Sequence, residues 1–204
     1  MALSKIDVAN MLTGATPVAN GGTGLTSGTT DQFLKFTGST TLASAADNTG
    51  GITEADMWRY TADTTGDVSP ITSNLERVDT VFDKIGTGMS ESSGVFTFPS
   101  TGIYEVVFRI YSYIDGENRD INAQIEATTD NSSYTTYARS TSAQFHASSS
   151  NTSANAEATM MFDVTNVSTH KVRFGVTFVN DNAHLYGETS SSLTWMRFTR
   201  LGDT

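Results

Sequence analysis

Cysteine is absent from this 204-residue chain, and its absence removes several classes of protein at once. Without a thiol there is no disulfide framework, no thiolate metal site and no cysteine nucleophile. Proline is also scarce, with three residues, and all three lie outside the interiors of the strands predicted below, where a missing N–H would interrupt the ladder. Stability must therefore come from packing or from assembly.

Basic residues and long apolar runs are scarce as well. Only 12 Lys and Arg stand against 22 Asp and Glu, so the formal net charge is −10 at pH 7. A protein that grips phosphate backbones needs clustered basic residues, and we expect no nucleic-acid partner. No stretch approaches the roughly 20 apolar residues of a membrane span, and residues 1–20 do not resemble a signal peptide. We expect no membrane insertion.

Neutral polar residues take the place of what is missing. Hydrophobic residues make up 37% of the chain and charged residues 17%, and Ser, Thr, Asn and Gly supply much of the rest. Thr suits a pleated surface, whereas Ser, Asn and Gly compete with helical hydrogen bonding. The composition therefore favours strands and turns over long helices.

The pattern changes near residue 51. Residues 1–51 are dominated by Gly, Thr, Ser and Ala and keep no apolar period, so we predict an extended low-complexity arm that other chains must hold in place. Residues 52–204 show strand-length runs punctuated by turns, which predicts a mainly β sandwich domain. We place its strands near residues 57–62, 75–84, 94–98, 102–114, 121–128, 134–145, 156–164, 171–180 and 192–201.

The clearest alternation runs through residues 102–114. Its first face reads Tyr104, Val106, Phe108 and Ile110, which is a core pattern. Its second face includes Val107, Arg109, Tyr111 and Tyr113. This face is too aromatic to be fully solvated and too charged for an ordinary core, a mixture typical of interfaces. We predict that these four residues lie in a subunit interface.

Residue types that carry chemistry occur without a catalytic spacing. The run from Gly22 through Gly24 to Ser27 is one residue short of a dinucleotide fingerprint and does not open a helix. There is no Gly-x-Ser-x-Gly elbow and no phosphate-loop lysine, and the three histidines form no helical pair. We predict that the protein is not an enzyme and has no catalytic, cofactor-binding or metal-binding residues.

One acidic loop keeps two interpretations. Asp115, Glu117 and Asp120 put several oxygen ligands into one tight segment that could hold a hard cation. The same segment makes an ordinary exposed hairpin, which the Asp-Gly pair signals. The turn is the favoured interpretation.

A second group points to recognition. Tyr134, Tyr137, Arg139 and Phe145 flank the polar run at residues 148–155, and loops at the ends of a sandwich are common recognition sites. We assign these four residues to a receptor-facing surface. The alternative is a strand whose Tyr and Arg side chains merely cover the sheet.

Two resemblances to known families cover most of the chain. Residues 18–24 read VANGGTG and residues 32–38 read QFLKFTG, which resembles the glycine-rich segments of bacteriophage tail-fibre and related virion proteins. The resemblance implies that residues 1–51 anchor the chain to other virion proteins, in a trimeric and fibrous part of the particle.

The second resemblance lies in the sandwich domain. Residues 82–84 read FDK, residues 94–99 read GVFTFP, residues 102–104 read GIY, and an aromatic closing strand surrounds Trp195. This order is similar to the complement-type and tumour-necrosis-factor-like heads. It implies a ten-stranded jelly roll that trimerises, although no acidic cluster maps onto the calcium positions of some family members.

The two resemblances imply a function together. We expect a homotrimeric phage fibre or knob protein, located in the virion, that acts in host attachment through multivalent contact with host-surface glycans or proteins. The alternative is a capsid decoration or head-fibre protein that binds no receptor.

Overall fold

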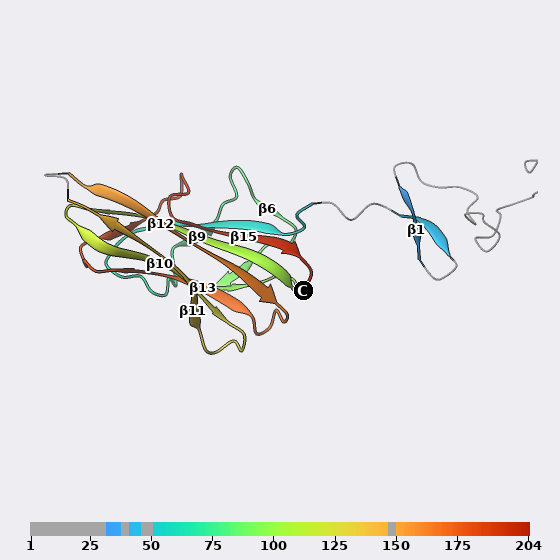
Figure 1. The fold of residues 1–204 in the computed structure, drawn as a ribbon. Coiled ribbons are helices and arrows are strands. Elements are labelled where there is room, and N and C mark those ends of the chain that lie inside the picture. Colours follow the sequence, from blue (N-terminus) through green and yellow to red (C-terminus); the bar gives the residue numbers. More distant parts are fainter. Residues whose placement is uncertain (1–31, 38–40, 46–50, 147–149) are drawn as a thin grey trace, which may run out of the picture. The chain divides into compact units, whose positions relative to one another are not determined.

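The computed structural model describes residues 32–37, 41–45, 51–146 and 150–204, and Figure 1 shows the chain as a ribbon. The chain divides into two compact units, Met1–Gly51 and Ile52–Thr204. Every regular element in the described ranges is a strand. No helix in these ranges is long and apolar enough to cross a membrane. Most of the predicted arm, including residues 18–24, lies outside the described residues.

The first unit contains one hairpin that the sequence did not predict. Strands β1 (Phe33–Phe36) and β2 (Leu42–Ala45) pair antiparallel. All four residues of β1 are exposed, so the hairpin is held by its backbone ladder rather than by a core. An isolated two-stranded hairpin is marginal in water.

The second unit is a sandwich of two antiparallel sheets. The five-stranded sheet has the order β11 (Thr135–Gln144), β10 (Asn118–Thr128), β13 (Lys171–Phe178), β8 (Val95–Thr97) and β7 (Ser90–Ser92). In the eight-stranded sheet, β9 (Gly102–Ile114) is flanked by β12 (Thr152–Val164) on one side and by β15 (Trp195–Gly202) and β14 (His184–Tyr186) on the other.

The remaining strands extend the eight-stranded sheet beyond β15 and β14. They are β3 (Ala55–Tyr60), β4 (Asp63–Thr65), β5 (Leu75–Arg77) and β6 (Lys84–Ile85). Because the connections cross between the two sheets, the unit is a jelly roll. The predicted fold class is confirmed.

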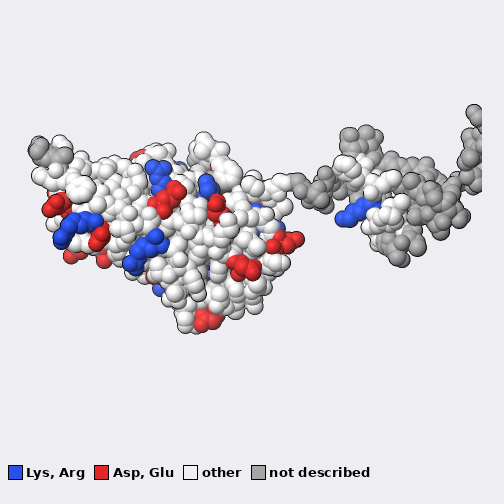
Figure 2. Space-filling model, in the orientation of Figure 1, with Lys and Arg blue, Asp and Glu red and all other residues white. Residues whose placement is uncertain are grey.

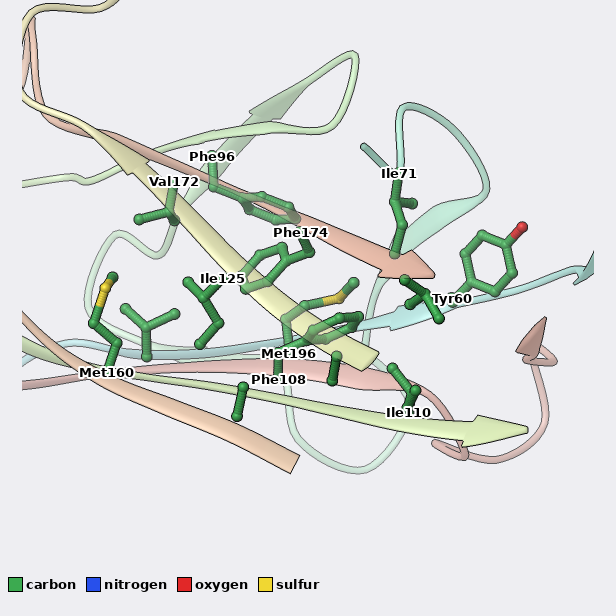
Figure 3. Close-up of a cluster of buried hydrophobic side chains, with 14 of the residues drawn as sticks. Tyr60, Ile71, Phe96, Phe108, Ile110, Ile125, Met160, Val172, Phe174 and Met196 are labelled. Carbon is green, nitrogen blue, oxygen red and sulfur yellow. The ribbon is translucent and has the colours of Figure 1, made fainter. Parts of the chain in front are cut away.

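The core fills the space between the sheets with aromatic and branched side chains (Figure 3). Phe174 of β13 lies 5.0 Å from Phe108 of β9 and 5.4 Å from Phe96 of β8, measured between ring centroids. Such pairs contribute about 0.5–1.5 kcal/mol each beyond the area they bury. The predicted core face of β9 is confirmed, since all four of its residues are buried.

One predicted strand is wrong. The run at 75–84 is interrupted after Arg77, which pairs with Trp58 in the ladder and bonds the buried carboxylate of Asp56. The ladder with β3 resumes only at β6. Asp56 also accepts hydrogen bonds from the Met89 amide at 2.7 Å and the Trp58 indole at 3.0 Å. The carboxylate therefore ties β3, β5 and the approach to β7 together.

Both ends of the second unit lie at one end of the sandwich. The Arg200 amide donates to the Glu54 carbonyl, and the C-terminus is marked at this end in Figure 1. Strand β9 leads away from it over 13 residues, roughly 40 Å at 3.3 Å per residue. We call the opposite end, formed by the turn at 115–117 and the loop at 179–183, the distal end.

Candidate assembly and recognition surfaces

The first candidate surface is the outer face of the eight-stranded sheet, which turns away from the core. Its residues on β9 are those that the sequence assigned to an interface, Val107, Arg109, Tyr111 and Tyr113. Arg109 lies opposite Glu157 of β12 and Trp195 of β15. Although Val107 points to this outer face, it is only 3% exposed, since neighbouring side chains already cover it.

An aromatic cluster occupies the distal half of this face. Tyr113 stacks on His184 with ring centroids 4.4 Å apart, and Tyr186 lies 5.7 Å from Tyr113 and 6.1 Å from Tyr111. Together with Asn151 and Ser153, the three tyrosines line a hollow of about 340 Å³. Sequence reasoning found Tyr111 and Tyr113 but not Tyr186.

Asp63 of β4 anchors the cluster. Its carboxylate accepts a 2.5 Å hydrogen bond from the Tyr113 hydroxyl and lies 2.8 Å from His184 Nδ1. The hydrogen bond to Asp63, aided by desolvation, raises the pKa of Tyr113 to about 12. The phenol is therefore a neutral donor at ordinary pH and stays fixed on the carboxylate.

Charged and apolar groups alternate over the rest of the outer face. Arg197 of β15 pairs with Glu105 of β9 at 3.1 Å and lies 5.8 Å from the Trp195 ring. Beside Glu105, Met161 of β12 is 67% exposed. A large exposed methionine among ion pairs and aromatic rings is a composition that protein interfaces favour.

The residues assigned to a receptor-facing surface do not form one patch. Tyr134 lies under the guanidinium of Arg173 at 4.1 Å, and burial raises the pKa of Tyr134. Phe145 is 76% exposed beyond the other end of β11, roughly 35 Å away by strand geometry. Tyr137 and Arg139 are exposed on the strand between them.

The second candidate surface is a hollow of about 470 Å³ at the distal end, which we call the distal pocket. Its lining residues are Glu117, Arg119, Val179, Asn180, Asp181 and Asn182. The loop that could have been a cation site or a turn is an exposed turn, with Gly116 at a φ of +149°. Within the described ranges, no group of three or more His, Asp or Glu side chains could hold a metal ion.

Charge is distributed without a large field of one sign on the face that Figure 2 presents, where acidic and basic side chains lie interspersed. The chain nevertheless carries ten more negative than positive charges. This face therefore shows no basic patch that would attract a polyanion.

No protein-family model matches the chain, and no curated protein matches it in sequence. Its fold is similar to that of the Eiger TNF of S. frugiperda, at 10% identity and a TM-score of 0.54, over 76% of this chain and 96% of that one. Murine APRIL matches at 11% identity and a TM-score of 0.51, over 72% and 98% of the two chains.

The globular domain of the zebrafish complement 1qA protein also matches, at 11% identity and a TM-score of 0.47, over 74% of this chain and 99% of that one. This third similarity adds nothing to the argument at that score. The first two show the fold, a TNF-like jelly roll, and at such low identity they show the fold alone.

Proposed function

We propose that the chain is a homotrimeric virion structural protein, a fibre or knob subunit, that acts in host attachment through multivalent surface recognition. The observation that supports assembly most directly is the outer face of the eight-stranded sheet. Three tyrosines, an exposed methionine and paired charges share this face, and nothing in the described part of the second unit covers it. A second copy of the chain supplies the missing layer.

The position of the chain ends supports a projecting knob. The jelly-roll unit begins and ends at one end of the sandwich, where the Arg200 amide bonds the Glu54 carbonyl, so its own two ends leave the distal loops clear. Loops carried at the free end of a rigid scaffold are well placed for recognition. Three copies around one axis would present three equivalent distal ends.

A trimer would bind a surface that displays many ligands more tightly than a single chain would. Linked weak sites gain avidity of about 10²–10⁴-fold through effective concentration, without any new contact. A knob with three shallow sites can therefore attach firmly to a surface that displays many copies of one ligand. The rigid two-sheet core holds the three sites in fixed geometry.

Oligomeric mass and attachment test the two parts of the proposal separately. Light scattering during gel filtration should give three times the chain mass, and a monomer would contradict the assembly. Particles that lack the protein should then adsorb poorly to host cells. Normal adsorption with altered shell stability would instead identify a capsid decoration protein.

A further inference from the structure

The distal pocket is built by two segments that lie sixty residues apart in sequence. The Asn180 side-chain amide donates to the Glu117 carbonyl at 3.1 Å, and its oxygen accepts from the Asn182 amide at 3.1 Å. Asn118 Oδ1 accepts from the amides of Val179 and Asn180 at 3.2 and 3.3 Å. These bonds fix the turn after β9 against the loop after β13, so the walls of the pocket are preformed.

Four of the residues that line the pocket have side chains without a bonding partner in the described structure. Glu117, Arg119, Asp181 and Asn182 are exposed. In the described parts of the chain, none of these four side chains makes a hydrogen bond or an ion pair of its own. A guanidinium and two carboxylates around one hollow would ordinarily be expected to pair, and here they leave donors and acceptors open.

A buried donor adjoins the same wall. Asn118 is 1% exposed, and its side-chain nitrogen has no hydrogen-bond partner in the described structure. Buried polar groups of folded proteins nearly always have a hydrogen-bond partner, and a buried group without one needs a specific explanation. Asn118 itself does not line the pocket. Its oxygen holds the amides of Val179 and Asn180, so its role at this wall is to fix the backbone.

The residues that line the distal pocket indicate which class of ligand it could bind. A sugar hydroxyl both donates and accepts, which suits a site that offers donors on Arg119 and Asn182 and acceptors on Glu117 and Asp181. Val179, half exposed, supplies an apolar surface for sugar C–H groups. Two carboxylates around one guanidinium disfavour an anion, and the guanidinium disfavours a cation.

We propose that the distal pocket binds a neutral glycan through its hydroxyl groups. The volume of about 470 Å³ falls within the roughly 300–1,000 Å³ of small-molecule sites. That the glycan belongs to a host surface rests on the proposed function; the pocket and its chemistry do not. Three such shallow sites in one trimer would gain strength through multivalent binding.

Binding of the full-length protein to an array of immobilised neutral and anionic oligosaccharides tests the site. The best neutral oligosaccharide is then titrated in solution. We expect neutral glycans to bind, and Arg119→Ala and Glu117→Gln each to weaken the affinity tenfold or more with unchanged oligomeric mass and melting temperature. Val81→Ala, at a side chain 91% exposed in the segment between β5 and β6, serves as the matched control and should bind normally.

Three results would overturn the site: no neutral glycan binding at millimolar concentration, binding of sialylated or sulfated glycans only, or full binding by both pocket variants. Competition with particles for host cells separates this inference from the proposed function. If wild-type protein and Arg119→Ala protein block attachment equally, attachment stands and the glycan site falls. If wild-type protein binds neutral glycans through the pocket but blocks nothing, the site stands and the attachment role falls.

Discussion

The imidazole ring of His184 lies flat against the phenol ring of Tyr113, with their planes 15° apart, and both side chains meet the carboxylate of Asp63. Strands β14, β9 and β4 each contribute one of these three groups. The contact therefore locks a short edge strand and a central strand into one rigid surface. That surface is the distal half of the proposed interface.

The titration of Tyr113 tests this arrangement. With a folded-state pKa of about 12 against an ordinary value of 10.0, the contribution to stability is fully present below pH 10 and is lost as the pH rises through 12. Asp63→Asn removes the negative charge and should lower the pKa of Tyr113 towards 10. Carbon NMR of labelled tyrosines, with Tyr113→Phe to assign the signal, measures it. An unchanged titration in Asp63→Asn would contradict the contact.

A charge at Met161 tests the proposed interface. Val107 is already covered within one chain, so a charged residue there would also damage the fold, whereas Met161 is largely exposed and makes a cleaner probe. Met161→Glu should reduce the assembled mass to that of a single chain and leave the fold intact, as measured by light scattering and circular dichroism. Tyr137→Glu, at a residue 60% exposed on β11, should leave the trimer whole. A trimeric Met161→Glu protein would show that another face assembles.

Asp56 should be the most sensitive carboxylate for folding. It is 1% exposed and receives bonds from Arg77, Trp58 and Met89. Breaking a buried charge pair by removing one partner costs about 3–5 kcal/mol, and Asp56→Ala should lower the free energy of unfolding by that amount in urea titrations. Asp203→Ala, which removes an exposed partner of Arg200, should cost at most about 1 kcal/mol. Equal losses would refute the role of Asp56.

Gly94 should tolerate no side chain. Its φ is +82°, and a Cβ built on it would lie 1.8 Å from the Ile71 carbonyl oxygen. Backbone strain alone predicts a loss of about 1–3 kcal/mol for Gly94→Ala, and the clash adds to it. Gly202→Ala places its Cβ in open space and should stay within about 0.5 kcal/mol of the parent. Thermal unfolding of the two variants makes the comparison.

Removing residues 1–51 should leave a folded jelly roll. Every core residue in the described part of the chain lies in residues 52–204, so the truncated chain should keep its strand spectrum and its unfolding temperature within a few degrees. Under the proposed function it should no longer enter particles. Normal incorporation, measured on purified particles, would show that the jelly roll itself docks to the virion.

The length of an alternating run decided which strands the sequence could predict. The bounds of β9 match the prediction at both ends, because its alternation is long and a glycine and an Asp-Gly turn border it. Strands β4, β7 and β14 have three residues each, too few to show any period. The segment 75–84 was predicted as one strand, but only its two ends, Leu75–Arg77 and Lys84–Ile85, lie in strands.

The candidate surfaces, like the strands, could be predicted only in part from the sequence. Tyr111 and Tyr113 could be found because they lie on one face of one strand, whereas Tyr186, His184 and Asp63 join them only through the pairing of short strands. The distal pocket likewise needs Glu117 and Asp181 to meet across a long stretch of chain. The spacing of residues in a sequence does not reveal which distant residues become neighbours in the fold.

Gly94, which opens the run GVFTFP at residues 94–99, has a structural explanation. Gly94 follows Ser93 in a tight turn where both residues have positive φ angles, and its missing side chain leaves room for the Ile71 carbonyl. The motif thus encodes the passage from β7 to β8.

Because the distal pocket is made of one turn and one loop, its lining can be exchanged without touching either sheet. Glu117, Arg119, Asp181 and Asn182 are exposed and bind nothing in the described part of the chain with their side chains, so their replacement costs the jelly roll little. Asn118 and Asn180 would keep the backbone of both segments in place. Under the proposed function, a change of host range would require a few surface substitutions on a constant framework, and closely related chains should differ most at this end.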